Sequence, residues 1–177
     1  WDVNEGEVLI NDDNVKKIPT KQLRNMESYG ILDAMGLTSR IVLDANIYTM
    51  NNRAEAFWMK KGILGDTVPL ELNAKELVHR NNKNSELTVY GYTPMMVSVQ
   101  CVQKTMDHCN HACVQYVLKD RYQKEFRGVC SCEFCYNTIY NTLPTSLLKE
   151  KEKAEKLGVK AYRFSFTTET QQETEKI

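Results

Sequence analysis

The chain has 177 residues, and its 23 Lys+Arg balance its 23 Asp+Glu, so the formal net charge is zero. This balance gives no global electrostatic attraction for nucleic acid, and a hydrophobic content of 42% excludes a disordered chain. No apolar run approaches the ~20 residues of a membrane-spanning helix, which argues against a membrane partner, and the first residues lack the features of a signal peptide.

The first predicted elements are a helix, a strand and a second helix. Residues 20–38 favour a helix. Residues 40–49 favour a strand that is buried on both faces, because the apolar residues 41–43 follow one another without interruption. Residues 51–62 favour a helix, since they carry apolar residues, among them Phe57, at helical spacing.

The alternation of strands and helices continues along the chain. Residues 66–72 predict a short strand, although Pro69 is unfavourable at the centre of a sheet. Asn73 is a preferred N-cap residue, and it predicts a helix over residues 74–83. Residues 85–101 are again rich in β-forming residues.

The C-terminal part adds a hairpin and one more strand–helix unit. Residues 116–129 alternate polar and apolar residues as a β-hairpin does. Residues 145–158 predict a charged amphipathic helix that ends at a glycine. Residues 159–169 predict the last strand, and residues 170–177 begin a helix.

Strands and helices that alternate every 20–25 residues, roughly, predict βα units and a parallel sheet. A doubly wound open sheet and a (β/α)8 barrel are the two arrangements to consider. No Gly-rich phosphate loop occurs, which counts against a nucleotide-binding open sheet. A complete barrel needs about 250 residues. We therefore expect an α/β chain that forms part of a TIM-type (β/α)8 barrel, with a cysteine-rich insertion.

Polar residues at the carboxyl ends of the predicted strands are the candidate catalytic residues, because the chemistry of βα folds gathers there. Glu71 and Glu169 are candidates for acid–base work, since partial burial raises the pKa of a carboxyl group toward neutrality. Asp44 and Arg163 would lie at the same edge. Three of the four also have a structural interpretation: Asp44 as a turn residue, Glu71 as part of a helix cap, and Arg163 as the partner of a neighbouring carboxylate.

Every cysteine of the chain lies between residues 101 and 135. Disulfide frameworks are usually spread through small chains that lack a core. The clustering therefore favours a metal or iron–sulfur site in a reducing compartment such as the cytoplasm, with disulfides and unbound thiols as alternatives. His108 and His111 lie among the cysteines and are zinc candidates, although exposed histidines in a polar loop are commoner. The cysteines are Cys101, Cys109, Cys113, Cys130, Cys132 and Cys135.

The step from Cys132 to Cys135 is a CxxC motif, which lets two sulfur atoms reach one metal from a tight turn. A distant pair would complete the four ligands of a zinc ion or of a four-iron cluster. The predicted hairpin between the two groups would fold Cys101 and Cys109 back beside this motif. The sequence thus predicts that two separated segments meet around one inorganic centre.

Several motifs are specific when taken together, above all a Tyr-Gly-Tyr-Thr-Pro-Met-Met run and a Cys-x-x-Cys-Tyr-Asn run. The stretches are "LDANIYTMN" (43–51), "VPLELNAKEL" (68–77), "ELTVYGYTPMMVSVQC" (86–101), "LKDRYQKEF" (118–126), "CEFCYNTIYNTLP" (132–144) and "YRFSFTTET" (162–170). In these motifs and their order the chain resembles the collagenase-like peptidase family of unknown catalytic type, family U-thirty-two.

The resemblance implies the later half of a TIM-type barrel, with the other half and flanking domains elsewhere in a longer protein. It implies a peptidase or collagenase activity. Other members of the family resemble oxygen-independent hydroxylases that hold a four-iron cluster and act on RNA bases or quinone precursors. The cluster ligands that the resemblance implies are Cys101, Cys109, Cys132 and Cys135, and the alternates are Cys113, Cys130 and His108.

We expect four segments and weigh three functions. Residues 1–40 match the family poorly, residues 41–100 hold βα units, residues 101–143 form the cysteine-rich insertion, and residues 144–177 hold the last βα unit. The first function is a peptidase acting on a peptide. The second is a cluster-dependent modifying enzyme acting on an RNA base or a small molecule. The third is a zinc-stapled structural domain without activity. The missing initial Met indicates a piece of a longer protein.

Overall fold

The computed structural model describes residues 9–10, 13–14, 21–23, 26–106 and 109–177. The chain divides into two compact units. Unit 1 comprises residues 1–88 and 151–162, and unit 2 comprises residues 89–150 and 163–177. Among the helices of the described residues, none combines the length and the apolar composition that crossing a bilayer requires.

Unit 1 is built from short strands and helices, of which the last strands continue into unit 2. Its helices are α1 (Met26–Ala34), α2 (Asn52–Lys60), α3 (Ala74–Leu77) and α5 (Lys151–Lys156), with 3-10 turns η1 (Thr38–Arg40) and η2 (Ala45–Ile47). Its strands are β1 (Leu9–Ile10), β2 (Asp13–Asn14), β3 (Lys21–Leu23), β4 (Ile41–Leu43), β5 (Gly65–Thr67), β6 (Ser85–Gly91) and β12 (Ala161–Ser165).

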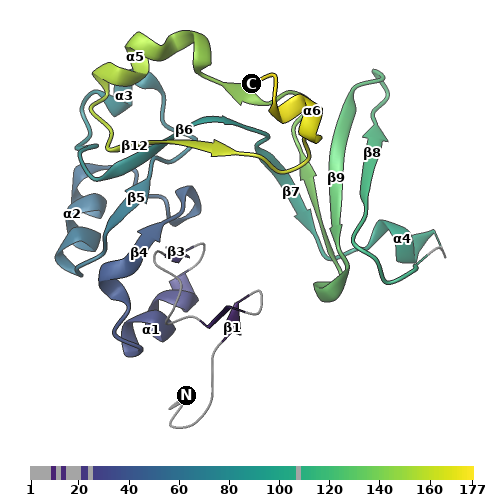
Figure 1. The fold of residues 1–177 in the computed structure, drawn as a ribbon, viewed down its shortest axis with the longest axis horizontal. Coiled ribbons are helices and arrows are strands. Elements are labelled where there is room, and N and C mark those ends of the chain that lie inside the picture. The colour runs from purple at the N-terminus through teal and green to yellow at the C-terminus, as the bar shows by residue number, and fades with distance from the viewer. Residues whose placement is uncertain (1–8, 11–12, 15–20, 24–25, 107–108) are drawn as a thin grey trace. The chain divides into compact units, whose positions relative to one another are not determined.

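A parallel sheet forms from strands that follow one another along the chain (Figure 1). β3 pairs with β4, β4 with β5 and β5 with β6, each pair parallel, and β12 also pairs with β6. The predicted parallel βα arrangement is therefore confirmed. Neighbouring strands in chain order are typical of a (β/α)8 barrel, but the described strands do not close into one.

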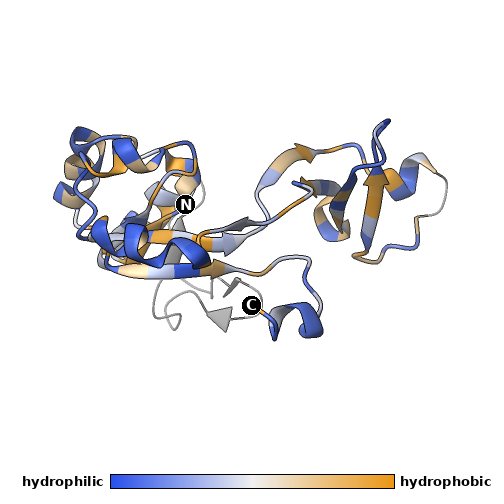
Figure 2. Ribbon diagram, turned by 90° about the horizontal axis from the view of Figure 1, so that it is seen from above, coloured by the Kyte–Doolittle hydropathy of each residue, from blue (hydrophilic) through white to orange (hydrophobic). Residues whose placement is uncertain are grey.

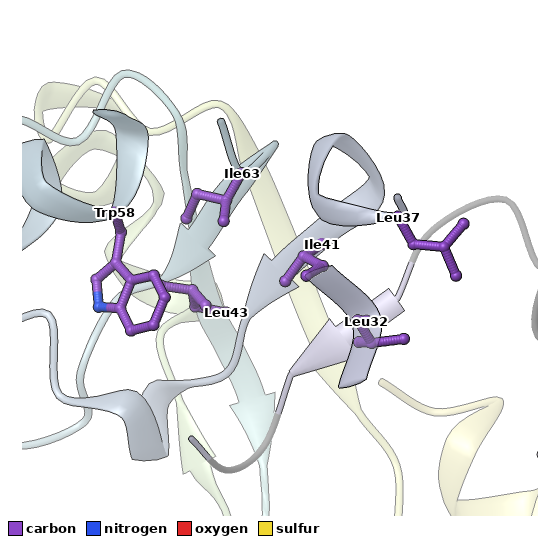
Figure 3. Close-up of a cluster of buried hydrophobic side chains, with 6 residues drawn as sticks. All are labelled: Leu32, Leu37, Ile41, Leu43, Trp58 and Ile63. Carbon is purple, nitrogen blue, oxygen red and sulfur yellow. The ribbon is translucent and has the colours of Figure 1, made fainter. Parts of the chain in front are cut away.

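The core of unit 1 lies between the parallel strands and helices α1 and α2. Both helices contain polar and apolar residues, and hydrophilic and hydrophobic residues alternate along the helices of the chain (Figure 2). Trp58 packs edge-on against Tyr29, with ring centroids 5.0 Å apart. Phe57, in contrast, is 55% exposed, so it does not join the core that its spacing predicts. The buried cluster is Leu32, Leu37, Ile41, Leu43, Trp58 and Ile63 (Figure 3).

Several elements are shorter than the sequence predicts. Within the predicted helix 20–38, the first described residues form β3 and the helix begins only at Met26. The predicted strand 40–49 ends at Leu43 because the Asp44 carboxylate accepts a hydrogen bond from the Ala45 backbone N–H (2.8 Å) and starts η2. The burial predicted for this strand is confirmed, since Ile41 and Leu43 are fully buried.

The β-rich stretch 85–101 forms two strands, β6 and β7 (Pro94–Ser98), which belong to different sheets. Gly91 ends β6 with a φ of 155°. A Cβ atom there would lie 2.7 Å from the carbonyl oxygen of Ser165. Only glycine therefore fits where the chain leaves this sheet.

A buried polar network joins strands β5 and β6 of unit 1 to two of its loops. The Arg80 guanidinium donates hydrogen bonds to the Asp66 carboxylate, the Thr49 carbonyl oxygen (2.8 Å) and the Ser85 hydroxyl (2.9 Å). The Ser85 hydroxyl in turn donates to Asp66 (2.6 Å). The Arg80 and Asp66 side chains are only 2% and 4% exposed. A buried charge pair with this many hydrogen bonds fixes the local geometry.

Unit 2 is centred on a four-stranded antiparallel sheet in the order β7-β10-β9-β8 (Figure 1). The predicted hairpin over residues 116–129 is confirmed as the β8–β9 pair, with Tyr116 opposite Gly128. The Asp120 carboxylate closes its turn by accepting the Tyr122 and Lys124 backbone N–H groups. The elements are α4 (Val102–Thr105), β8 (Gln115–Lys119), β9 (Glu125–Ser131), η3 (Cys132–Phe134), β10 (Tyr136–Tyr140), β11 (Thr145–Ser146), η4 (Leu148–Glu150) and α6 (Gln171–Thr174).

Candidate functional site

All six cysteines lie in unit 2, and all six are free thiols. Cys101 immediately precedes α4, and the loop from α4 to β8 carries two more. Cys130 is in β9, while Cys132 and Cys135 begin and follow the turn η3 between β9 and β10. The hairpin therefore brings the two cysteine segments together, as its position in the sequence predicts.

Three donors from both segments form a group that can hold a metal ion. The ligand atoms of Cys109, His111 and Cys132 all lie within 4.8 Å of one another. Ligands of a tetrahedral zinc, at about 2.0–2.3 Å from the ion, are separated by roughly 3.3–3.8 Å. Small side-chain movements would bring the three atoms into that geometry. His111 has a φ of 55°, so the loop turns sharply at this residue.

The CxxC turn adds further sulfur atoms around Cys132. Cys135 has a left-handed backbone (φ 52°), and its N–H donates to the Cys132 carbonyl oxygen (3.2 Å). The Cys132 N–H donates to the Cys113 sulfur (3.4 Å). This bond places the Cys113 sulfur beside the Cys132 backbone.

A pair of buried thiols, Cys101 and Cys130, lies beside the three-donor group. Cys101 and Cys130 are buried, with sulfur atoms 3.7 Å apart, and they pack with Cys132 and the Tyr116 side chain. Burial raises the pKa of the Cys130 thiol to about 11. The pKa of Cys101 is lowered, chiefly by a hydrogen bond from the Lys104 backbone. One thiol of the pair thus ionises much more readily than the other.

The structure places the predicted ligands in two subsets. Cys109 and Cys132 belong to the three-donor group, and Cys135 follows Cys132 at the end of the turn η3. Cys101 instead contacts Cys130. His108 lies outside the described residues. From the sequence, His111 could be either a zinc ligand or an ordinary exposed histidine of a polar loop. In the structure it is the histidine of the three-donor group.

The four candidate catalytic residues divide between the units. Asp44 and Glu71 are in unit 1, and Arg163 and Glu169 are in unit 2. Asp44 starts η2, as the turn interpretation predicts. Glu71 is exposed on a turn, and it is Asn73 that caps α3, with its side chain accepting two backbone N–H bonds.

The two candidates in unit 2 have different surroundings. Arg163 is half-buried in β12. Glu169 accepts hydrogen bonds from the Thr167 N–H (2.7 Å) and the Thr168 N–H (2.9 Å) with one carboxylate oxygen. Burial and the nearby Glu169 carboxylate raise the pKa of Tyr90 to about 12. Glu169 therefore organises its own turn and faces a tyrosine.

Sequence reasoning missed an arginine pocket in unit 2. The Arg127 guanidinium lies over the Tyr92 ring, 4.8 Å from its centroid, and donates to the Glu173 carboxylate (2.7 Å) and the Thr168 carbonyl oxygen (3.2 Å). The bond from Arg127 holds the pKa of Glu173 at about 2. The T-x-x-E capping box from Thr170 to Glu173 was a readable signal, but its distant arginine partner was not.

This arginine borders a cavity of about 390 Å³, which we call the Arg127 pocket. Arg127 and Val117 pair across the β8–β9 hairpin. Strand alternation puts them on the opposite face from Gly128 and Cys130. Arg127 and Val117 therefore line the pocket from the face opposite Cys130, while Tyr116 lines the pocket and also packs against the buried cysteines. The residues that line the Arg127 pocket are Tyr92, Gln115, Tyr116, Val117, Glu125, Arg127, Thr142, Thr168, Thr170 and Glu173.

Comparison of the chain with protein-family models, with curated proteins and with solved structures gives no match. The family resemblance therefore rests on the sequence motifs alone. The arrangement of thiols and histidine is an independent observation, because it depends on the fold and not on the resemblance.

Proposed function

We propose that unit 2 holds an inorganic centre on its cysteine cluster and is the metal-bearing part of an enzyme. The observation that carries this proposal is the meeting of Cys109, His111 and Cys132, whose ligand atoms lie within 4.8 Å of one another. They come from two segments that are separated by a complete hairpin. Free thiols gathered from distant segments are the donor set that thiolate-bound metals require.

A four-iron cluster on four thiolates is the occupant that we propose first. Tetrahedral zinc and a four-iron cluster each take four protein ligands, so the six cysteines are enough for either. A four-iron cluster is a larger centre than a single ion, so its four cysteines can lie farther apart. Cys101, Cys109, Cys132 and Cys135 are the ligands that the family resemblance implies, and this chain's hairpin holds them in one unit.

Zinc is the second candidate, and one observation favours it. His111 is a member of the three-donor group. A mixed set of Cys109, His111, Cys132 and Cys135 is a Cys₃His set, which is common for structural zinc. In this case the metal would stabilise the fold of unit 2 and carry out no chemistry.

We further propose that the chain belongs to the collagenase-like peptidase family U-thirty-two, and that the full-length protein is a cluster-dependent modifying enzyme. The density of thiols supports this chemistry. Peptidase activity, the alternative within the family, needs an activated nucleophile or water. Its candidate base Glu71 is an exposed residue of a turn.

The test is the metal content of the chain purified without oxygen. We expect about four iron and four sulfide per chain, with absorption near 400 nm. Cys132→Ser should remove most of the iron, whereas Glu133→Gln, an exposed change in the same turn, should keep it. One zinc without sulfide would establish the second candidate, and a chain that holds neither would refute the metal centre.

The peptidase alternative has its own measurement. Cleavage of gelatin by the full-length protein that persists after chelation and disappears in Glu71→Gln would establish it. Activity that follows the iron content and is unaffected by Glu71→Gln would instead support the cluster-dependent enzyme. The matched control is Glu76→Gln, which changes another exposed glutamate five residues further along the chain, in the capping box of α3.

A further inference from the structure

Asn137 lies in the middle of a row of three side chains that crosses the antiparallel sheet of unit 2. It is opposite Ser98 of β7 on one side and opposite Cys130 of β9 on the other. Residues that are directly opposite in such a sheet point to the same face, with Cβ atoms roughly 4.5–5.5 Å apart. Asn137 is 1% exposed, and it is the second residue after Cys135. It therefore lies close to cysteines of the CxxC turn and of β9.

The Asn137 amide also holds the chain where it leaves β7. Its Nδ2 atom donates a hydrogen bond to the Gln100 carbonyl oxygen (2.7 Å), 37 positions earlier in the sequence. The Gln100 backbone N–H donates to the Ser98 hydroxyl (3.2 Å). Two side chains from one cross-strand pair thus hold both backbone polar groups of Gln100. Cys101 follows directly, immediately before α4.

The residue after this anchor is one of the buried thiols. The Cys101 sulfur lies 3.7 Å from the sulfur of Cys130, which is the residue opposite Asn137. Both pack with Cys132, a member of the three-donor group. The contacts therefore run from the Asn137 amide through the backbone to Cys101, and from Cys101 to the candidate metal centre.

The Asn137 side chain combines a favourable and an unfavourable group. Its Nδ2 atom makes the bond to Gln100, whereas its Oδ1 atom is buried and has no hydrogen-bond partner among the described residues. A buried polar atom without a partner is destabilising, and this cost offsets the gain from the bond. The contribution of the amide that remains is the position it gives to the Gln100–Cys101 segment.

We propose that Asn137 is a positioning residue of the cysteine cluster. Its amide holds the Gln100–Cys101 segment against the sheet, so that the Cys101 thiol stays beside Cys130. The effect on metal binding rests on the proposed function, in which Cys101 is a ligand of the four-iron cluster. The effect on the distance between the two thiols does not depend on a metal.

The first test measures the proximity of the two thiols in the metal-free full chain. In a glutathione buffer, two thiols of the protein and one glutathione disulfide exchange to one protein disulfide and two glutathione thiols. Peptide mass spectrometry gives the equilibrium ratio of the Cys101–Cys130 disulfide to its reduced form. Asn137→Leu should lower this ratio about tenfold or more, because a mobile segment reduces the effective concentration of one thiol at the other.

A matched variant controls for the loss of an asparagine in unit 2. Asn141→Leu makes the same chemical change at a residue whose side chain accepts a bond from the neighbouring Thr142 N–H, and it should leave the disulfide ratio unchanged. Equal ratios in Asn137→Leu and Asn141→Leu overturn the proposal. If Asn137→Leu does not fold, Asn137→Ser replaces it, since a serine hydroxyl is too short to reach the Gln100 carbonyl oxygen. A ratio that is unchanged in Asn137→Ser overturns the proposal as well.

The second test measures the iron content of the chain purified without oxygen. Asn137→Leu should lose more than about half of the iron that Asn141→Leu retains, because residues that orient a ligand strongly affect metal affinity. In a Cys101→Ser background the same change should cause no further loss, because the thiol that Asn137 positions is already absent. An equal additional loss in that background would assign the effect to the fold as a whole and would overturn the positioning role.

The two tests separate this inference from the proposed function. If the unmodified chain holds neither iron nor zinc, the proposed function fails, and the glutathione measurement still decides the role of Asn137. If the unmodified chain holds iron and Asn137→Leu changes neither measurement, the positioning role alone fails. A lower disulfide ratio with full iron content supports the position of the thiol and overturns its part in the metal centre.

Discussion

The sulfur atoms of Cys101 and Cys130 lie 3.7 Å apart, although 29 positions separate the two residues in the sequence. A disulfide requires about 2.05 Å, so the two are neighbouring thiols. The contact ties the start of α4 to the end of β9. It shows that the β8–β9 hairpin, and not sequence proximity, assembles the cysteine cluster.

The two thiols of this contact should react at different pH values. In metal-free protein, Cys101 should be alkylated before Cys130 as pH rises, because the pKa of Cys101 is lowered and burial raises the pKa of Cys130 to about 11. Only the thiolate is reactive. Iodoacetamide labelling followed by peptide mass spectrometry at several pH values measures this order. Equal labelling rates at every pH would contradict it.

Replacing Arg80 by Met should destabilise the protein by about 3–5 kcal/mol, because the Asp66 carboxylate would remain buried without its partner. Urea unfolding measures the loss. Arg53→Met is the control, since Arg53 is an exposed residue of α2 and its change should cost less than about 0.5 kcal/mol. The same cost for the two variants would show that the buried pair does not stabilise the fold.

Gly128→Ala should disturb unit 2 through Tyr116. A Cβ atom at Gly128 would lie 2.3 Å from the Tyr116 ring, so the ring must move. We expect a loss of about 1–3 kcal/mol, measured by thermal unfolding. Gly30→Ala in α1 is the control, because nothing lies within 4 Å of its added Cβ and alanine favours a helix.

A second substitution identifies the cause of the Gly128→Ala effect. Tyr116→Ala removes the ring that the new methyl group would strike. If the clash is the cause, adding Gly128→Ala to Tyr116→Ala should cost clearly less than adding it to the unmodified chain. An unchanged cost in the two backgrounds would assign the effect to the backbone of β9 instead.

Stability should depend on pH through Glu173. Its pKa in the folded protein is about 2, below the ordinary value of 4.5, because it accepts a hydrogen bond from Arg127. The stabilisation that the ionised Glu173 carboxylate contributes is therefore complete above about pH 4.5, and it is lost as pH falls from there toward 2. Thermal unfolding across this range should show Glu173→Gln less stable than the unmodified chain at pH 7, with the difference shrinking in acid. A difference that stays constant down to pH 2 would contradict the ion pair.

Local patterns were sufficient for some features of the structure. The uninterrupted apolar run 41–43 predicted a strand buried on both faces, and it is one. Asn73 predicted the start of α3 because a cap is decided within one turn of chain. The hairpin was predictable for the same reason, since its two strands adjoin along the sequence. Each of these signals acts over a few residues.

Features that depend on distant partners were not predictable. Phe57 and Trp58 have the same apolar character, but only Trp58 meets α1. Arg127 looked like any polar residue of a hairpin, and its role depends on Glu173, 46 positions away. The antiparallel pairing of β7 with β10 was missed because nothing in either strand specifies its partner. Among the cysteines, the sequence predicted the meeting of two segments but not the division into subsets.

The order of strands in the parallel sheet bears on how the chain folds during synthesis. β4, β5 and β6 each pair with the strand that precedes them in the chain, so each can add to an edge that is already formed as it emerges. β12 also pairs with β6, but the cysteine-bearing segment is made between them. Closing so long a loop is entropically costly unless the intervening residues fold first. A ribosome-bound chain that has not yet organised its hairpin should therefore carry β6 with an open edge.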